Sequence, residues 1–244
     1  MPSLRESTHT LWWTLAMILE VCYTNFVKRV PIDQIITKLR KASRKWVMPS
    51  VSFVAIQTND PFRILISTLL SLRTKDATTL EASKRLFALA FTPEKMRKLS
   101  ARQIEHAIFP VGFYRTKAKR IVEICDTLIH QCNGKVPDDM EELLKLKGVG
   151  RKTANLVVTL GFGKPGICVD THVHRISNRL GIVKTKTPHE TEFALMKVLP
   201  KRYWIDYNDL LVSFGQNLCA PISPWCSKCP IEKACPKISV TSRR

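Results

Sequence analysis

Apolar and polar positions along most of this chain follow the spacing of helices rather than that of strands. Residues 32–45, IDQIITKLRKASRK, place apolar side chains every three or four positions among basic ones, which predicts an amphipathic helix. Residues 62–73, FRILISTLLSLR, are apolar on nearly every side, which predicts a central buried helix. The pair Asp60-Pro61 stands directly before it and is typical of a helix start.

The same spacing continues to the end of the chain. Further helices are expected at 76–89 with Asp76 as cap, after Pro93 and Ser100, at 114–132, from Asp138, at 152–160, from Asp170, at 188–198 and at 204–218. No stretch of any length shows the period of two that marks a strand. The sequence therefore predicts an all-α fold.

Residues 1–30 follow this pattern least. Residues 11–23, LWWTLAMILEVCY, form an apolar run interrupted by Glu20. The run is too short to span a bilayer, and no convincing signal-peptide cleavage site follows it. We expect an N-terminal extension, either an extra helix packed on the body or a segment outside the fold, whose role the sequence leaves open.

The charge of the chain narrows the choice of partner. There are 39 Lys and Arg against 20 Asp and Glu, which gives a formal net charge of +19 and an isoelectric point near 9.9. Such an excess favours polyanionic partners and salt-sensitive association. A ribosome-associated factor would share this property, but nucleic acid is the expected partner in either case.

A Gly148-Val149-Gly150 turn separates two helical segments. Glycines allow backbone conformations closed to other residues and leave unpaired N–H groups at the start of the second helix, where phosphate binds. Val149 can turn inward and fix the angle between the helices. The pattern indicates a helix-hairpin-helix at about 141–160, and an ordinary turn with a glycine cap is the alternative.

A weaker copy of this layout occurs earlier, in the stretch from Pro110-Val-Gly112-Phe to Lys117-Ala. It is either a second, degenerate hairpin or a purely structural turn.

Lys152 and Asp170 are the candidate catalytic residues near the first turn. A lysine with an ordinary pKa of about 10.4 is a weak nucleophile at neutral pH, so a catalytic lysine needs desolvation or nearby positive charge. Arg151 is adjacent in sequence, and the N-terminal end of a helix is also positive. Asp170 stands where a helix N-cap is expected. The alternatives are a lysine that contacts phosphate and an aspartate that only caps.

The eight cysteines fall into two groups. Cys22, Cys125, Cys132 and Cys168 are scattered, whereas Cys219, Cys226, Cys229 and Cys235 form C-x6-C-x2-C-x5-C within seventeen residues. This division indicates buried thiols and one metal centre in a reducing compartment rather than a disulfide scaffold. Four thiolates suit either zinc or a 4Fe-4S cluster. His172 and His174, two positions apart, make a poor metal pair on a helix.

Together these features resemble the endonuclease III family of DNA glycosylases over about residues 35–238. The motifs are PVGFYRTKAKRI, GVGRKTAN, VDTHVHRISNRLG and LLVSFGQNLC. The resemblance implies a helix-hairpin-helix DNA glycosylase fold with two helical halves beside a DNA-binding cleft. It also implies that residues 55–165 form a six-helix barrel, and that 31–54 and 166–244 form a metal-bearing domain with an iron-sulfur loop at 219–235.

The resemblance also implies roles for particular residues. Lys152 would be the nucleophile, Asp170 its carboxylate, and the four clustered cysteines the ligands of a 4Fe-4S cluster. The hairpin residues Gly148, Val149, Gly150 and Arg151 would contact DNA. Arg73 stands where the family often has glutamine, in Leu70-Ser71-Leu72-Arg73-Thr74-Lys75-Asp76. It would either fill the gap left by a flipped nucleotide or contact phosphate.

The function that the resemblance implies is a bifunctional DNA glycosylase and AP lyase of base excision repair. It would release oxidised pyrimidines from duplex DNA and cleave the abasic site by β-elimination through a lysine Schiff base. The alternatives are a monofunctional mismatch glycosylase and a non-catalytic iron-sulfur DNA-binding protein. We expect a cytoplasmic, nucleoid-associated monomer that binds damaged or abasic double-stranded DNA and no membrane.

Overall fold

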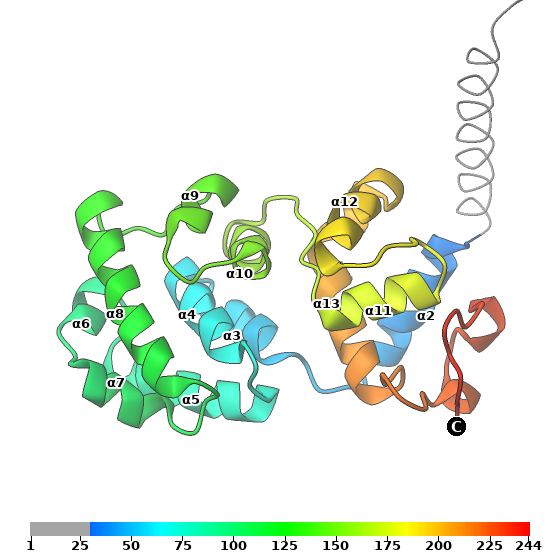
Figure 1. The fold of residues 1–244 in the computed structure, drawn as a ribbon, viewed down its shortest axis with the longest axis horizontal. Helices are drawn as coiled ribbons and strands as arrows, with labels where there is room; N and C mark the ends of the chain where they lie inside the picture. The colour runs from blue at the N-terminus through cyan, green and yellow to red at the C-terminus, as the bar shows by residue number, and fades with distance from the viewer. Residues whose placement is uncertain (1–29) are drawn as a thin grey trace, which may run out of the picture.

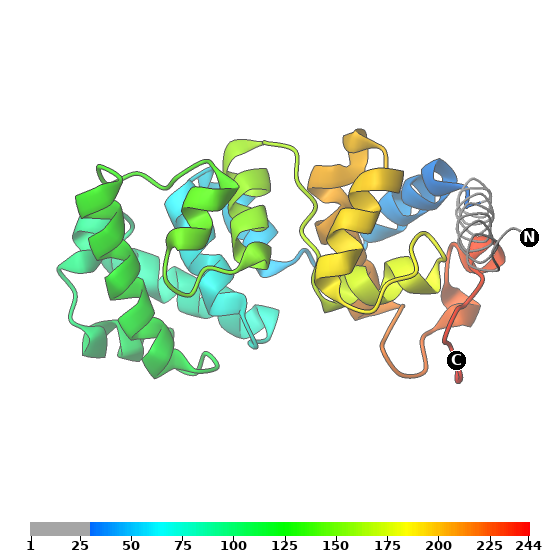
Figure 2. The same cartoon turned by 45° about the horizontal axis from the view of Figure 1, so that its top comes forward.

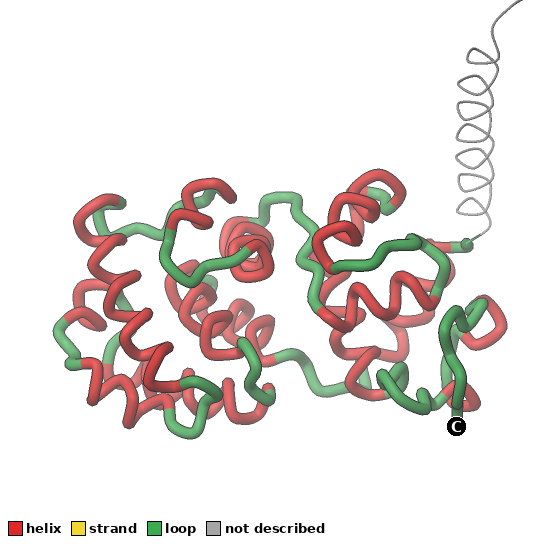
Figure 3. Tube along the Cα trace, viewed as in Figure 1, coloured by secondary structure: helices red, strands yellow, loops and turns green. Residues whose placement is uncertain are grey.

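The computed structural model describes residues 30–244, so the apolar run at 11–23 lies outside the described residues. Within this range every regular element is a helix, and Figure 3 shows no strand there. The predicted all-α class is therefore confirmed. No helix between residues 30 and 244 has both the length and the apolar character needed to cross a bilayer.

The helices run in chain order as follows: α2 (Ile32–Ser43), α3 (Ser50–Thr58), α4 (Pro61–Ser71), α5 (Asp76–Leu89), α6 (Pro93–Arg97), α7 (Ala101–Ile108), α8 (Tyr114–Gln131), α9 (Met140–Lys145), α10 (Arg151–Leu156), α11 (Thr171–Arg179), α12 (Pro188–Val198) and α13 (Trp204–Asn217). A π-helical turn, η1 (Val157–Gly161), extends α10, and short 3-10 turns occupy η2 (Lys201–Tyr203), η3 (Cys226–Lys228) and η4 (Glu232–Ala234).

Local side-chain chemistry sets several of these boundaries. Asp60 Oδ1 accepts hydrogen bonds from the backbone N–H groups of Phe62 and Arg63 at the start of α4, which satisfies two N–H groups that have no partner within the helix. The helix expected from Asp138 begins later, because Asp139 is the residue that caps α9.

The structure also holds one helix that the sequence pattern did not predict. Helix α3 has buried residues around most of its circumference, including two serines, so it lacks the one-sided apolar stripe that identifies an amphipathic helix. This is why its sequence, SVSFVAIQT, gave no helical signal.

Two apolar clusters divide the helices into two lobes (Figures 1 and 2). The first lobe contains α3 to α10, with a cluster that runs from Val51 to Val158. The second contains α2, α11, α12 and α13, with a cluster that joins residues 35–39 to residues 167–231. Helix α2 reaches the second lobe by packing against α13, where Arg40 pairs with Asp206 at 2.5 Å.

The chain therefore crosses between the lobes twice, once after α2 and once before α11 (Figure 1). The domain boundaries drawn from the sequence, at residues 55 and 165, stay a prediction. What matters for the site is that α10 belongs to the first lobe and α11 to the second, so Lys152 and Asp170 approach one another from opposite sides.

Candidate active site

The turn at Gly148 has a backbone conformation that glycine permits. Gly148 has a φ of +86°, which L side chains rarely adopt, and an added Cβ would lie 2.8 Å from the side chain of Arg120. Val149 is buried in the first lobe. Gly150 is the N-cap of α10 and offers no side chain to its first N–H groups. The turn thus anchors itself through valine and opens the start of α10 to an anion.

Lys152 and Asp170 lie together between the lobes. Lys152 Nζ is 4.0 Å from Asp170 Oδ2, and the two side chains are 36% and 10% exposed. Asp170 Oδ1 accepts hydrogen bonds from the N–H groups of His172 and Val173, at 2.8 and 2.9 Å. The carboxylate therefore caps α11 with one oxygen and presents the other to the amine, so the structural and the catalytic interpretations of Asp170 are compatible.

A cavity of about 200 Å³ lies against this pair. Both lobes contribute polar side chains to its lining: Ser52, Ser71, Thr74 and Asp76 from the first lobe, and His172, Asn208 and Gln216 from the second. Its volume exceeds the roughly 30 Å³ that one water occupies in the liquid, so the cavity can accept a small polar group rather than only solvent.

Two polar bridges connect the lobes. In the first, beside the cavity, Gln216 Nε2 donates to Asp76 Oδ2 at 2.9 Å, and Ser50 Oγ donates to the other oxygen at 2.8 Å. The expectation that Asp76 caps α5 is wrong, because Asp76 is the first residue of that helix and its N-cap residue, Lys75, makes no side-chain cap. The carboxylate is used to join α3, α5 and α13 instead.

The second bridge between the lobes joins Glu192 of α12 to the hairpin helix α10. Its carboxylate accepts from Arg151 at 2.5 and 3.1 Å and from Asn155 at 3.1 Å. Glu192 is 5% exposed, and the Arg151 guanidinium also lies over the Phe193 ring. The positive charge of Arg151 is thus paired within the protein. Sequence reasoning missed Glu192, since one carboxylate on an amphipathic helix carries no signal of its own.

The second turn, at residues 110–113, lies against the loop that carries Arg73. Thr74 Oγ1 accepts from Gly112 N at 3.1 Å, and an added Cβ at Gly112 would lie 2.6 Å from the carbonyl oxygen of Arg73. Lys117 Nζ donates to the carbonyl oxygens of Leu70 and Leu72 at 2.9 and 2.6 Å. The turn and the loop therefore form one connected unit.

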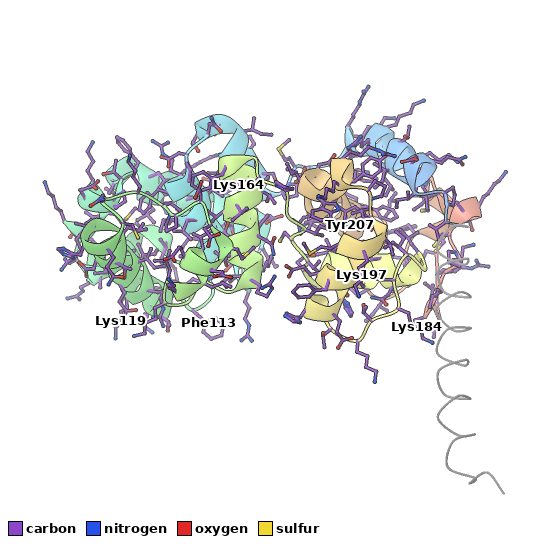
Figure 4. The ribbon with its side chains drawn as sticks, turned by 90° about the horizontal axis from the view of Figure 1, so that it is seen from above. Phe113, Lys119, Lys164, Lys184, Lys197 and Tyr207 are labelled. Carbon is purple, nitrogen blue, oxygen red and sulfur yellow. The ribbon has the colours of Figure 1, made fainter. Side chains whose placement is uncertain are left out.

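Phe113 and Arg73 stand at the outer edge of this unit. Both have positive φ, 58° and 53°, and the Arg73 guanidinium lies 5.5 Å from the centre of the Phe113 ring. Phe113 is 62% exposed and lies at the rim of the first lobe in Figure 4. Phe113 was not among the site residues predicted from the sequence, although an aromatic residue directly after Val111-Gly112 was an available signal.

The four clustered cysteines line one small cavity of the second lobe, of about 30 Å³. Apolar side chains such as Phe214, Trp225 and Ile231 complete its wall. Within residues 30–244, no group of three or more His, Cys, Asp or Glu side chains is arranged to hold a metal ion. The fit of a cofactor therefore rests on the donor set, which is four thiols facing one apolar space.

Arginine side chains hold the backbone around these thiols. Arg179, which is buried, donates to Cys219 Sγ at 3.4 Å and to the carbonyl oxygens of Ala220 and Pro221 at 2.7 and 2.6 Å. Burial raises the pKa of Cys229 to about 11 and also raises that of Cys235. A bound cation would favour the thiolates at neutral pH, since metal ligation deprotonates a thiol, and Arg179 adds positive charge beside one of them.

Known proteins of similar sequence and structure identify the family of this chain. Residues 66–201 match the model of the HhH-GPD superfamily of base excision DNA repair proteins. An endonuclease III from Thermotoga maritima is 53% identical over 176 residues, which are 72% of this chain and 83% of that protein.

Solved structures agree with this comparison. A non-covalent endonuclease III–DNA complex matches with a TM-score of 0.76 and 37% identity over 86% of this chain and 95% of that one. A trapped covalent endonuclease III–DNA intermediate matches with a TM-score of 0.74 and 36% identity over 86% and 96%. This chain belongs to the endonuclease III family, within the HhH-GPD superfamily of base excision DNA repair proteins.

Proposed function

We propose that this protein is a bifunctional DNA glycosylase and AP lyase that removes oxidised pyrimidines from duplex DNA. The observation that carries the proposal is the pairing of Lys152 Nζ with Asp170 Oδ2, 4.0 Å apart, at a cavity between the lobes. An amine beside a carboxylate in a partly enclosed site has the groups that Schiff-base chemistry requires.

Lys152 is the nucleophile of the reaction. Its neutral amine attacks C1' of the deoxyribose while the bond between C1' and N1 of the base breaks, and the electrons of that bond pass to the base. Asp170 Oδ2 accepts the proton that the nitrogen loses, and its negative charge stabilises the positive charge that develops on the sugar. The proton then passes to the departing base, which balances the step.

The covalent adduct explains the second activity. When the sugar ring opens, the bond from Lys152 to C1' becomes a protonated Schiff base, which acidifies the C2' hydrogens. Loss of one of these protons expels the 3' phosphate, and water then hydrolyses the Schiff base and frees the lysine. One structural neighbour is a trapped covalent endonuclease III–DNA intermediate, which supports this route over direct hydrolysis.

The target nucleotide must leave the helical stack, because C1' and the glycosidic bond are inaccessible within the duplex. Phe113 and Arg73 fill the space that it leaves. Both side chains are exposed, and the guanidinium contacts the ring, which supports this role. A base stacked on an aromatic side chain gains about 1–3 kcal/mol.

Backbone N–H groups at Gly148 and Gly150 bind a phosphate of the DNA strand that carries the lesion, whereas the N–H group of Val149 donates to the carbonyl oxygen of Leu146 at 2.9 Å and holds the turn. The positive φ of Gly148 and the missing side-chain cap at α10 support this contact. Arg151, which pairs with Glu192, serves to hold α10 against α12. The net charge of +19 strengthens the attraction to DNA over the whole surface.

Cys219, Cys226, Cys229 and Cys235 hold a 4Fe-4S cluster. The fit of four thiols around one apolar cavity supports this assignment, together with membership in the endonuclease III family. When bound, the cluster fixes the fold of the loop at 219–235 and takes no part in base removal. The enzyme acts as a monomer, in a reducing compartment that keeps these thiols available.

Duplexes with one thymine glycol, or with one abasic site, test the proposal. Base release followed by strand cleavage with a β-elimination end is the expected result, with a visible absorption band in the purified protein. Base release with an intact strand would indicate a monofunctional glycosylase and overturn the lyase assignment. Binding without any reaction would indicate a DNA-binding protein and overturn both activities.

A further inference from the structure

His172 lines the cavity but has no part in the reaction proposed above. It is the second residue of α11 and lines the same space as Lys152 and Asp170. Its ring packs on Gly215 of α13, where an added Cβ would lie 2.2 Å from His172 Nδ1. Only glycine leaves room for the imidazole in this position, so the backbone of α13 fixes where the ring lies.

A neighbouring arginine determines which ring nitrogen carries the proton. Arg175 Nη2 lies 3.2 Å from His172 Nδ1, and a guanidinium can only donate. Nδ1 is therefore the acceptor, and in the neutral ring Nε2 carries the hydrogen. Arg175 is itself held by the carbonyl oxygen of Cys219, at 2.8 Å. Among residues 30–244, Nε2 has no hydrogen-bond partner.

The surroundings also keep the ring neutral. Burial lowers the pKa of His172, and the positive charges of Arg175 and Lys152 lower it further, against the opposing effect of Asp170 and Asp76. Two positive and two negative groups thus face the ring from α10, α5 and its own helix. A neutral imidazole whose N–H is free at a cavity wall can donate to an oxygen of a bound molecule.

We propose that His172 Nε2–H binds a carbonyl oxygen of the flipped pyrimidine and stabilises the negative charge that the base acquires as the glycosidic bond breaks. This inference rests on the proposed function, since it assigns the leaving group of that reaction. The electrons of the C1'–N1 bond pass to N1 and are delocalised onto the carbonyl oxygen at C2, which neighbours N1 also in a ring-saturated lesion such as thymine glycol. A positioned N–H at this oxygen acts as an oxyanion donor does in acyl transfer, without transferring a proton.

This role predicts a difference between the two activities of one enzyme. Base removal needs the donor, whereas strand cleavage at a preformed abasic site involves no base. His172→Phe keeps a ring over Gly215 but has no N–H, so we expect base release in single turnover to fall about 10²- to 10³-fold. Cleavage of abasic DNA and borohydride trapping on it should stay within about 3-fold of the wild type.

Two further variants separate this role from a structural one. His172→Gln places an amide N–H near the position of Nε2 and should recover part of the lost base release. His174→Gln is the matched control. The Nδ1 atom of His174 lies 2.6 Å from Thr191 Oγ1, and His174 does not line the cavity. We expect it to leave the ratio of the two activities unchanged.

The outcomes distinguish the inference from the proposed function. If His172→Phe lowers both activities equally, or neither, His172 is no donor to the base and the inference is wrong, although the Lys152 chemistry can stand. If the wild type forms no borohydride adduct on abasic DNA, the proposed function itself fails.

Discussion

The two turns of the first lobe share a layout and yet present their lysines to different surroundings. In both, a buried valine precedes a glycine and a helix that carries a lysine: Val111 with Lys117 on α8, and Val149 with Lys152 on α10. Lys152 Nζ faces a carboxylate at the interlobe cavity. Lys117 Nζ is directed into its own lobe, where the carbonyl oxygens of Leu70 at the end of α4 and of Leu72 in the Arg73 loop accept its hydrogen bonds.

A lowered lysine pKa therefore does not by itself identify a nucleophile. Burial lowers the pKa of Lys117 to about 8, in the range typical of catalytic lysines. Yet its amine is 2.9, 2.6 and 3.3 Å from Leu70 O, Leu72 O and Thr74 Oγ1 and does not line the cavity. Access to a substrate and a nearby proton acceptor distinguish Lys152, and these depend on the second lobe.

The largest effect should come from Lys152→Gln. Without the amine there is no group to form the Schiff base, so strand cleavage at an abasic site should fall by about 10⁴-fold or more, while binding to the same duplex changes little. Single-turnover cleavage and binding titrations measure the two quantities. Normal nicking by this variant would show that Lys152, after the turn at residues 148–150, is no more a nucleophile than Lys117.

Asp170→Asn should give the next largest effect. The oxygen of asparagine still caps α11, so the fold is kept, but the carboxylate that we propose as acceptor of the Lys152 proton is lost. We expect base release to slow by about 10²- to 10⁴-fold, with DNA affinity nearly unchanged. A thermal melt equal to that of the wild type would confirm that only the chemistry was altered. Unchanged turnover would leave Asp170 a helix cap and nothing more.

Phe113→Ala tests the role of the turn at residues 110–113. The ring is exposed beside Arg73 and has no share in the reacting atoms, so its loss should weaken binding of lesion-containing duplex by about 10- to 100-fold. Strand cleavage at saturating enzyme should remain within a few-fold of the wild type. Fluorescence of a base analogue next to the lesion reports whether the nucleotide still leaves the stack.

Lys117→Met should have the smallest effect on chemistry and a clear effect on stability. It leaves the carbonyl oxygens of Leu70 and Leu72 without this donor, at a cost of about 1–3 kcal/mol in the free energy of unfolding. Borohydride trapping should be retained. Loss of trapping in a folded Lys117→Met protein would reverse the roles given to the two lysines.

The same variant has a pH dependence of known sign. The pKa of Lys117 is about 8 in the folded protein and about 10.4 in an unfolded chain. Between these values the unfolded chain holds more protons, so the wild-type lysine makes the protein more stable as the pH rises. The difference in unfolding free energy between wild type and Lys117→Met should therefore grow from about pH 8 to about pH 10, as denaturant titrations would measure.

Much of the fold was predictable because its signals are local. Helix starts at Asp60 and Asp170 follow from side chains that accept hydrogen bonds from N–H groups a few residues away. Helix α3 was not predicted, since it is buried on most sides and has no amphipathic stripe. An amphipathic pattern reveals a helix because one of its faces is exposed to water. It gives no signal for a helix that is buried on most sides.

The site was predictable only in part. Lys152, Asp170 and the cysteine run came from motifs whose spacing is visible in one dimension. The ion pair of Glu192 with Arg151 and the packing of His172 on Gly215 depend on which helices meet across the lobes. No periodicity within one segment encodes such a meeting, so these residues became visible only in the folded structure.

The proposed chemistry requires that the amine of Lys152, and no other, forms a bond to the sugar. Borohydride reduction of the enzyme on abasic duplex DNA, followed by proteolysis and mass spectrometry, identifies the modified residue directly. The adduct should be found on the peptide that contains Lys152. An adduct on Lys117, on another lysine or on the N-terminal amine would show that Lys152 is not the nucleophile.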